Sequence, residues 1–308
     1  MKTLFEFKTL TEFTDYFCDE KTCREAFAGL RWRNGEFCPF CNHREIYHFK
    51  SGTRYRCAKC KQDFGIKQGT VFGDSKLPLR KWFIALYLLS TSGKGISSYQ
   101  LAKQLGVTQK TAWFVNHRIR QAMKQGAGQL FGQVEADETY IGGKSKNRHA
   151  RQRPVRGRGP VGKFTVVGAI QRGGSVRAAV VSAPSKPELR NFIRLNVKSG
   201  ATLFTDEHPG YEGIAGYSGD IIRHSFGEYS KGLAHTNNIE SFWALFKRGY
   251  HGIYHYMSRK HLQRYVNEYC YRFNRRNGEM KGIFAETLNN MATGRHLTLR
   301  QLVDEPII

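Results

Sequence analysis

The sequence predicts a multidomain α/β protein in which an N-terminal zinc ribbon and a helix-turn-helix region precede a larger α/β domain. Two Cys-x-x-Cys pairs lie fifteen residues apart, and two amphipathic helical stretches joined by a glycine turn follow them. Beyond a glycine linker, short β-rich runs alternate with helical ones. We expect a helical segment at 1–36, the ribbon at 37–73, the helix-turn-helix region at 76–126, the α/β domain at 132–290 and a tail at 291–308.

The net charge indicates a polyanionic partner. Forty-nine Lys and Arg residues against twenty-five Asp and Glu give +24, and nucleic acid is the commonest partner of a soluble protein with this excess. Ribosome association or an anionic membrane surface are alternatives, but no basic amphipathic helix stands out. The longest apolar run, Trp82–Leu89, is far shorter than the ~20 residues that span a bilayer. No signal peptide is visible, so we expect a cytoplasmic protein without membrane contact.

The cysteine pairs predict one structural Zn²⁺. Each pair forms a tight knuckle that offers two thiolates to a tetrahedral ion, and the residues between the pairs fit a short hairpin. Four thiolates complete the coordination shell, so the ion stabilises a fold too small for its own core and has no open position for catalysis. The expected ligands are Cys38, Cys41, Cys57 and Cys60.

The stretch from Ser97 to about Lys124 has the pattern of a helix-turn-helix. A short helix ends at Gly106, and Thr108 caps a second helix with a buried apolar face. We expect the other face of that helix to contact DNA through Gln109, Lys110, Arg118 and Arg120. A plain helical hairpin is the structural alternative.

A second basic region lies within the α/β domain. No Asp or Glu occurs from Thr139 to Pro187, whereas eleven Lys and Arg do. The part from Gly142 to Gly162 is rich in Gly and Arg and too poor in apolar side chains to fold alone, so we expect a long loop. The expected DNA contacts here are Lys144, Lys146, Arg148, Arg151, Arg153, Arg156, Arg158 and Lys163.

Acidic residues end two of the β-rich runs, as Asp137-Glu138 and Asp206-Glu207. Neighbours in a strand point to opposite faces, so only one residue of each pair is expected to face a shared site. We choose Asp137 and Asp206, with Glu138 and Glu207 facing away. Glu240 follows near the start of a helix, where its spacing from Asn237 also fits a capping box.

The ordered motifs resemble bacterial insertion-sequence transposases with an N-terminal zinc ribbon, relatives of the eukaryotic Merlin elements. The motifs are DETYIGG, GRGPVGK, VVGAIQRGG, TDEHPGY and HTNNIESFWALFKRGYHGIYHYMS, within about Phe37 to Leu288. The resemblance implies a ribonuclease-H-like DDE domain, with Glu240 as third acid after Asp137 and Asp206, and Lys247 as the basic residue seven positions later. It also implies a homo-oligomeric synaptic complex that binds terminal inverted repeats and target DNA, and a bacterial protein that is nucleoid-associated when bound.

The three carboxylates suit two Mg²⁺ or Mn²⁺ ions, because hard oxygen ligands leave positions for water and phosphate. Such a centre supports in-line cleavage and strand transfer at a phosphodiester. A ribonuclease-H-like nuclease without strand transfer is the nearest enzyme alternative. The alternative from another class is a zinc-ribbon and helix-turn-helix transcription regulator whose C-terminal domain is catalytically inactive. We expect Trp243, near Glu240, to pack in the core.

Overall fold

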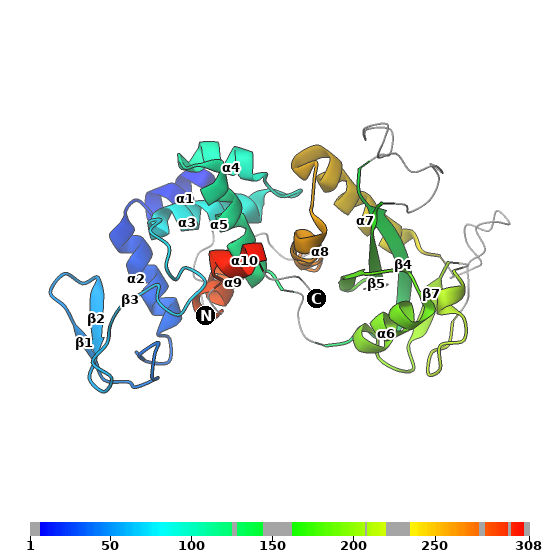
Figure 1. Cartoon of the computed structure of the whole chain (residues 1–308), viewed down its shortest axis with the longest axis horizontal. Helices are drawn as coiled ribbons and strands as arrows, with labels where there is room; N and C mark the ends of the chain where they lie inside the picture. Colours follow the sequence, from blue (N-terminus) through cyan, green and yellow to red (C-terminus); the bar gives the residue numbers. More distant parts are fainter. Residues whose placement is uncertain are drawn as a thin grey trace. The chain divides into compact units, whose positions relative to one another are not determined.

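The structure is a computed structural model that describes residues 7–124, 128–143, 162–206, 208–219, 235–276, 281–294 and 297–304. The chain forms two compact units (Figure 1). The N-terminal unit comprises Met1–Met123 together with Gly278–Pro306, and the second unit comprises Lys124–Asn277. The last helices of the chain therefore belong to the same unit as its beginning.

The N-terminal unit is mainly helical. Its helices are α1 (Leu10–Tyr16), α2 (Glu20–Arg31), α3 (Leu79–Thr91), α4 (Ser98–Leu105), α5 (Gln109–Ala122), α9 (Lys281–Thr293) and α10 (Leu299–Asp304). Aromatic rings fill the core between them. Phe13 stacks on Tyr87 with ring centroids 4.4 Å apart and meets Phe284 of α9 edge-on at 5.4 Å. Burial of these rings stabilises the unit by joining helices that are distant in sequence.

Helix α9 lies outside the expected limits, which assigned 278–290 to the α/β domain and 291–308 to a tail. It packs against α2, α3 and α5 of the N-terminal unit. The amide of Val71 donates to the carbonyl of Met291 at 3.1 Å, and the side-chain amide of Asn290 donates to the carbonyl of Ala122 at 3.2 Å. These contacts join segments more than 160 residues apart, which no local pattern predicts.

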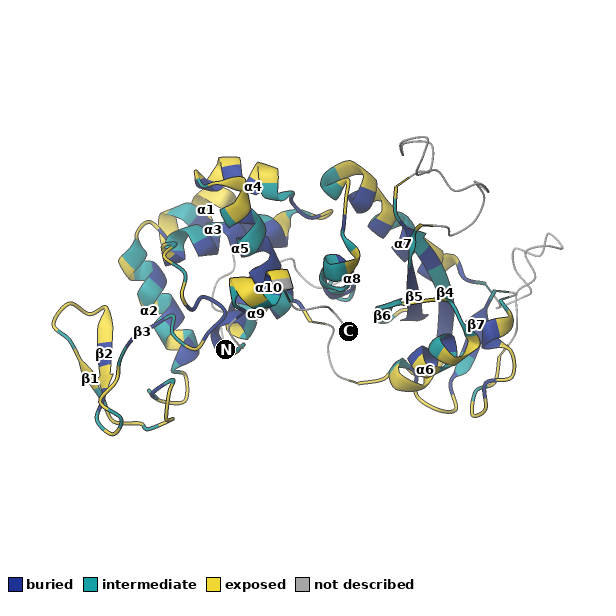
Figure 2. Ribbon diagram, viewed as in Figure 1, coloured by how far each residue is buried: buried dark blue, intermediate teal, exposed yellow. Residues whose placement is uncertain are grey.

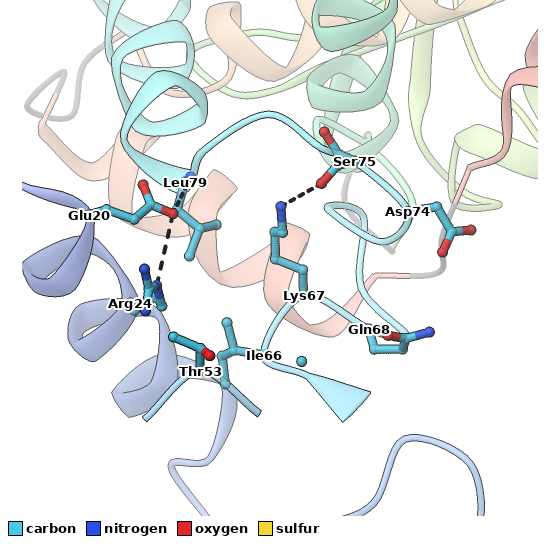
Figure 3. Close-up of a pocket in the computed structure, with 10 residues that line it drawn as sticks. Glu20, Arg24, Thr53, Ile66, Lys67, Gln68, Asp74, Ser75 and Leu79 are labelled. Atoms are coloured by element: carbon cyan, nitrogen blue, oxygen red, sulfur yellow. Dashed lines mark hydrogen bonds and ion pairs between the residues drawn. The ribbon is translucent and has the colours of Figure 1, made fainter. Parts of the chain in front are cut away.

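The zinc ribbon is a three-stranded antiparallel sheet in the order β1-β2-β3, formed by β1 (Ile46–His48), β2 (Arg54–Cys57) and β3 (Asp63–Gly65). A cavity of about 390 Å³ lies where the ribbon meets the helices (Figure 3). At its wall the Glu20 carboxylate accepts from the amides of Leu79 and Arg80 at 2.9 and 3.0 Å, which caps α3. The Lys67 ammonium donates to the carbonyls of Ser75 and Leu77. The charged groups of this cavity thus hold the ribbon-to-helix connection.

The second unit contains a four-stranded sheet in the order β6-β5-β4-β7. Its strands are β4 (Gln133–Ile141), β5 (Phe164–Gln171), β6 (Val176–Val181) and β7 (Thr202–Thr205), and helix α6 (Lys186–Asn196) connects β6 to β7. The first three strands pair antiparallel, and β7 lies parallel to β4. This order and direction is that of the ribonuclease-H-like fold. The last of the β-rich runs in the sequence, DIIRHSF at 220–226, lies outside the described residues.

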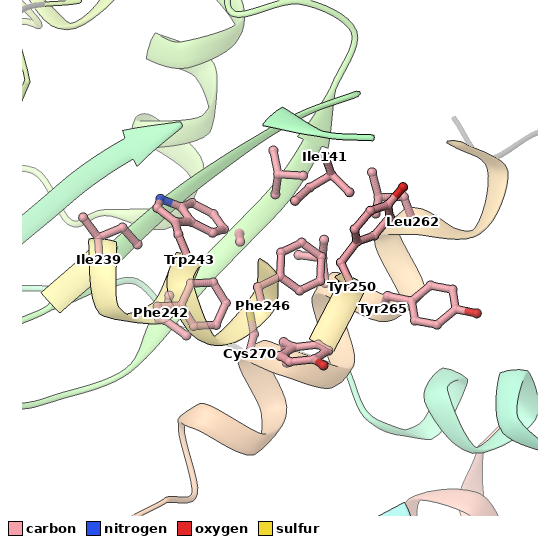
Figure 4. Packing of buried hydrophobic residues seen from close by; sticks show 14 of the residues in the cluster. Ile141, Ile239, Phe242, Trp243, Phe246, Tyr250, Leu262, Tyr265 and Cys270 are labelled. Carbon is pink, nitrogen blue, oxygen red and sulfur yellow. The ribbon is translucent and has the colours of Figure 1, made fainter. Parts of the chain in front are cut away.

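Helices cover both faces of this sheet. Side chains alternate along β5, so Val166 packs with α7 (Asn237–Gly249) and α8 (Arg259–Phe273), whereas Val167 packs with α6. A π-helical turn, η5 (Tyr250–Tyr254), follows α7. Aromatic rings of α7 and the turn fill the first of these two cores (Figure 4). The central strands β4 and β5 are accordingly among the most buried segments (Figure 2).

Candidate metal centre

Two neighbouring strands bring acidic side chains to one edge of the sheet. The parallel pairing of β4 with β7 ends where Ala136 meets Thr205. Asp137 and Asp206 each follow directly, and ligand sites in α/β sheets lie beyond such carboxyl ends of parallel strands. The structure brings these two aspartates together, and one oxygen each of Asp137, Asp206 and Glu138 all lie within 4.8 Å of one another.

Glu138 is the unexpected member of this group. Strict alternation along a strand predicts that Glu138 faces away from Asp137, and this expectation is wrong. Beyond Ala136, strand β4 keeps its partner β5 on one side but has no β7 partner on the other. On that open side the longer Glu138 side chain reaches the end of β7. Glu207, for which the same orientation was expected, lies outside the described residues.

The segment after β7 holds two of these carboxylates. The amide of His208 donates to Oδ1 of Asp206 at 3.1 Å. The Tyr211 hydroxyl donates to Oε2 of Glu138 at 3.1 Å, and Nε2 of His208 lies 3.9 Å from Oε1 of the same carboxylate. Tyr211 is buried in a short 3-10 helix, η3 (Pro209–Tyr211). His208 and Tyr211 therefore orient Asp206 and Glu138, respectively.

Burial and mutual repulsion oppose the ionisation of these carboxyl groups. Burial, followed by the charges of Asp206 and Glu138, raises the pKa of Asp137 to about 7. Burial and the charge of Asp206 also raise the pKa of Glu138. A divalent cation removes this penalty because it attracts the same oxygens, and carboxylates are preferred ligands of Mg²⁺ and Mn²⁺. The donor set therefore fits a divalent metal centre.

Glu240 lies in the first turn of α7, exposed, and outside the group of three carboxylates. Its charge is still close enough to contribute to the raised pKa of Asp137. The expected capping box with Asn237 is not formed, because Thr236 is the N-cap and its hydroxyl donates to Oε1 of Glu240 at 2.9 Å. The side chain of Glu240 is thus held near the metal centre by the residue before its own helix.

Glu135 anchors the start of α7 to β4. Its fully buried carboxylate accepts from the amides of Asn238 and Ile239 at 2.9 and 3.2 Å, and from Nε of Arg172 at 2.9 Å. A carboxylate at a helix N-terminus satisfies amides that lack partners in the helix and interacts favourably with its dipole. The first acid of the Glu-Ala-Asp-Glu run therefore positions the helix that carries Glu240. Sequence reasoning missed this role because the helix amides that Glu135 binds lie more than 100 residues away.

Gly168 sets how closely α7 approaches the sheet. It pairs with Asp137 across β4 and β5, and a Cβ at this position would lie 2.6 Å from the Trp243 ring. Trp243 is 3% exposed, so it packs in the core as expected. The glycine opposite Asp137 thus places α7 beside the carboxylates.

The four cysteines of the ribbon converge as the spacing predicts. Their sulfurs lie within 4.8 Å of one another, with Cys38 and Cys60 3.6 Å apart and Cys41 and Cys57 3.5 Å apart. A tetrahedral ion with Zn–S bonds of about 2.3 Å requires S···S distances of about 3.8 Å. The site fits one structural Zn²⁺, in a domain of zinc-ribbon form.

Family models match both parts of the chain. Residues 129–274 match the ISXO2-like transposase domain, and residues 18–63 match the transposase zinc-ribbon domain. A Halobacterium salinarum protein described as an uncharacterized protein in transposable element ISH50 is 30% identical over 247 residues. The alignment covers 75% of this chain and 83% of that relative. The chain belongs to the ISXO2-like transposase family.

It is therefore a DNA transposase, and its second unit is a catalytic domain of the DDE type. Among solved structures, the simian T-cell lymphotropic virus intasome with a PP2A regulatory subunit aligns over 60% of this chain and 67% of its own, at 15% identity and a TM-score of 0.29. The Mos1 strand transfer complex aligns over 68% and 74%, at 12% identity and a TM-score of 0.28. These likenesses are too weak to support the fold, which rests on the strand order.

The transposase has the two helices expected for a helix-turn-helix. Gly106 ends α4 with φ 59°, and the Thr108 hydroxyl accepts from the amide of Thr111 to cap α5. Gln109 and Lys110 are exposed at the start of α5. The left-handed glycine and the capping threonine together explain the tight turn between the helices.

Arg118 and Arg120 do not face solvent, which corrects the expected DNA contacts of α5. They are 2% and 1% exposed. Nε of Arg118 donates to the carbonyl of Leu297 at 2.9 Å and Nη1 to that of Gly73 at 2.8 Å, while its guanidinium lies 4.4 Å from the Phe114 ring. Their face of α5 is covered because the C-terminal segment packs on it.

The structure describes Lys247 and Lys163, two further residues that we expected at functional sites. Lys247 is exposed on α7, and Lys163 lies beside Gly142 where β4 ends and β5 begins. The remaining basic residues of the expected loop lie outside the described residues: Lys144, Lys146, Arg148, Arg151, Arg153, Arg156 and Arg158. Within the described ranges, no helix of the transposase combines the length and apolar character needed to cross a bilayer.

Proposed function

We propose that this transposase binds the terminal inverted repeats of its element, cleaves DNA at their ends and joins the 3′-ends to target DNA. The observation that carries the proposal is the convergence of Asp137 and Asp206 at the end of β4 and β7. Two Mg²⁺ or Mn²⁺ ions bound there would activate a water or 3′-hydroxyl and stabilise the leaving oxygen. The ISXO2-like family membership supports the same chemistry.

We assign catalytic roles to four residues. Asp137 and Asp206 hold the ions, and Glu240 supplies a third carboxylate from α7, whose start Glu135 anchors to β4. Lys247 lies seven residues after Glu240, about 10 Å along the helix, and is exposed. We assign it to a DNA phosphate next to the metal centre, where its positive charge orients the backbone without replacing a ligand.

DNA recognition falls to the exposed basic and polar side chains. α4 and α5 act as the helix-turn-helix, with Gln109 and Lys110 directed to base edges or phosphates. Lys163 and the basic residues of 144–158 supply phosphate contacts near the catalytic domain. Because two element ends must be brought together for transposition, the active form is a homo-oligomer on DNA.

A paired-end reaction tests this function. Purified protein is incubated with Mg²⁺ or Mn²⁺ and a labelled duplex of its native element end, beside Asp137→Ala, Asp206→Ala and Glu240→Ala. We expect metal-dependent nicking and joining by the wild type, loss of both in all three variants, and unchanged DNA binding. Lys198→Ala, an exposed basic residue that precedes β7 whereas Asp206 follows it, is the matched control and should retain activity.

The outcomes separate the alternatives. Activity that survives only in Glu240→Ala would assign the third ligand to another residue. Tight DNA binding without cleavage by the wild type, with either metal and with paired ends supplied, would favour the catalytically inactive regulator. Cleavage without joining would favour a nuclease.

A further inference from the structure

We propose that Glu138 is a further metal ligand of the catalytic centre, and that His208 and Tyr211 position its carboxylate. The inference rests on the proposed two-ion centre and deepens it. Glu138 shares an ion with Asp137 and Asp206, whereas Glu240, which lies outside this group, serves the second ion.

The geometry separates the two glutamates. An oxygen of Glu138 lies within 4.8 Å of an oxygen of both Asp137 and Asp206, close enough for the three carboxylates to bind one ion. Glu240 is exposed, and its Oε1 accepts from the Thr236 hydroxyl. Glu138 is thus closer to the aspartate pair than the glutamate that the family resemblance implies.

The surroundings of Glu138 call for a cation. Its side chain is only 7% exposed, and within the described part of the chain no Lys or Arg forms an ion pair with it. A buried carboxylate is costly unless it is paired or coordinates a metal. The Tyr211 hydroxyl is a neutral donor, so it orients the carboxylate without neutralising it.

The orientation of Glu138 and that of Asp206 have a common origin. The amide of Gly210 donates to Nδ1 of His208 at 3.1 Å, so the neutral ring carries its hydrogen on Nε2, which lies 3.9 Å from Oε1 of Glu138. The backbone amide of the same histidine donates to Asp206. His208 and Tyr211, both of which follow β7, therefore orient the carboxylates of Asp206 and Glu138 toward one another.

Direct measurement of Mn²⁺ binding tests the inference without relying on activity. The zinc-loaded full chain, free of DNA, is titrated with Mn²⁺ and followed by EPR of the free ion and by calorimetry. We expect Glu138→Gln to weaken the tighter Mn²⁺ by on the order of 100-fold, and Tyr211→Phe by about 10-fold, as for residues that orient a metal ligand. Glu240→Gln should instead weaken the binding of the second Mn²⁺, which has the lower affinity. Glu212→Gln, exposed one residue after Tyr211, should bind as the wild type does.

Wild-type Mn²⁺ affinity in a folded Glu138→Gln variant would overturn the inference. Zinc content and circular dichroism verify folding. If that variant does not fold, Glu138→Asp replaces it, because the shorter carboxylate keeps the charge but not the reach, and unchanged affinity would again refute the role. Absence of Mn²⁺ binding and cleavage in the wild type would instead refute the metal centre itself. Loss of binding in Asp137→Asn with retention in Glu138→Gln would refute only the inference.

Discussion

At the scale of single residues, the candidate metal centre is a concentration of like charge. Asp137, Glu138 and Asp206 converge at a strand end, and the raised pKa values of the first two record the cost of ionising them together. Groups arranged for function commonly reduce the stability of a fold in this way. The metal ions that the centre is suited to hold would relieve the repulsion.

Replacement of Asp137 should therefore stabilise the metal-free transposase. Its folded-state pKa, about 7, lies above the unfolded value of about 3.9, so its stabilising contribution is present at low pH and lost as pH rises through 7. We expect Asp137→Asn to raise the melting temperature at pH 8, by about 2–4 °C for each kcal/mol relieved, and by less at pH 5. Calorimetry of the EDTA-treated full chain would measure the melting temperature of the second unit. An equal gain at both pH values would contradict the electrostatic origin.

At the scale of elements, α7 links the sheet to the metal centre. Glu135 caps its first turn, Gly168 admits Trp243 against the sheet, and Glu240 and Lys247 lie along its exposed side. The position of the helix thus depends on two residues of neighbouring strands. Catalytic geometry should be sensitive to changes under the helix that leave every acidic side chain in place.

Gly168→Ala tests this dependence. The added Cβ would lie 2.6 Å from the Trp243 ring, so α7 must shift, at a cost of about 1–3 kcal/mol. We expect the rate of end cleavage to fall by at least tenfold while zinc content stays normal, because the ribbon lies in the other unit. Gly252→Ala, where nothing lies within 4 Å of an added Cβ, is the control. Full activity of Gly168→Ala would show that the packing does not set the geometry.

At the scale of the whole molecule, the end of the chain completes the unit that its beginning starts. Helix α9 packs on α2, α3 and α5, and the carbonyl of Leu297 accepts from the buried Arg118. Leu302 of α10 is fully buried, whereas its neighbour Val303 is 52% exposed. The N-terminal unit therefore reaches its full stability only with α9 and α10, which follow the catalytic domain in the chain.

A pair of substitutions on α10 measures this completion. Leu302→Ala should destabilise the N-terminal unit by about 2–5 kcal/mol, as buried Leu to Ala changes do, and should lower the temperature of zinc release. Val303→Ala should change stability by less than about 0.5 kcal/mol. Equal, small effects of both substitutions would show that α10 is dispensable for the unit.

Local patterns in the sequence determined much of this protein. The cysteine spacing predicts the ribbon, Gly106 and Thr108 predict the turn between α4 and α5, and the acids after two β-rich runs predict which strands carry the centre. Each of these signals lies within a few residues, where chain stiffness, capping and coordination geometry decide the outcome. The ordered motifs also indicate the family without any knowledge of the strand order.

Only the tertiary structure decided which side chains those patterns bury or bring together. A helical period marks two faces of α5 but does not show that the C-terminal segment covers Arg118. Alternation in β4 predicts opposite faces for Asp137 and Glu138, and only the early end of β7 lets both reach one point. In the sequence Glu135 is one more acid of the run, and only the structure shows that its carboxylate accepts from the amides at the start of α7. In each case the deciding contact joins residues far apart in the chain, and the burial that such contacts create has no counterpart in local sequence.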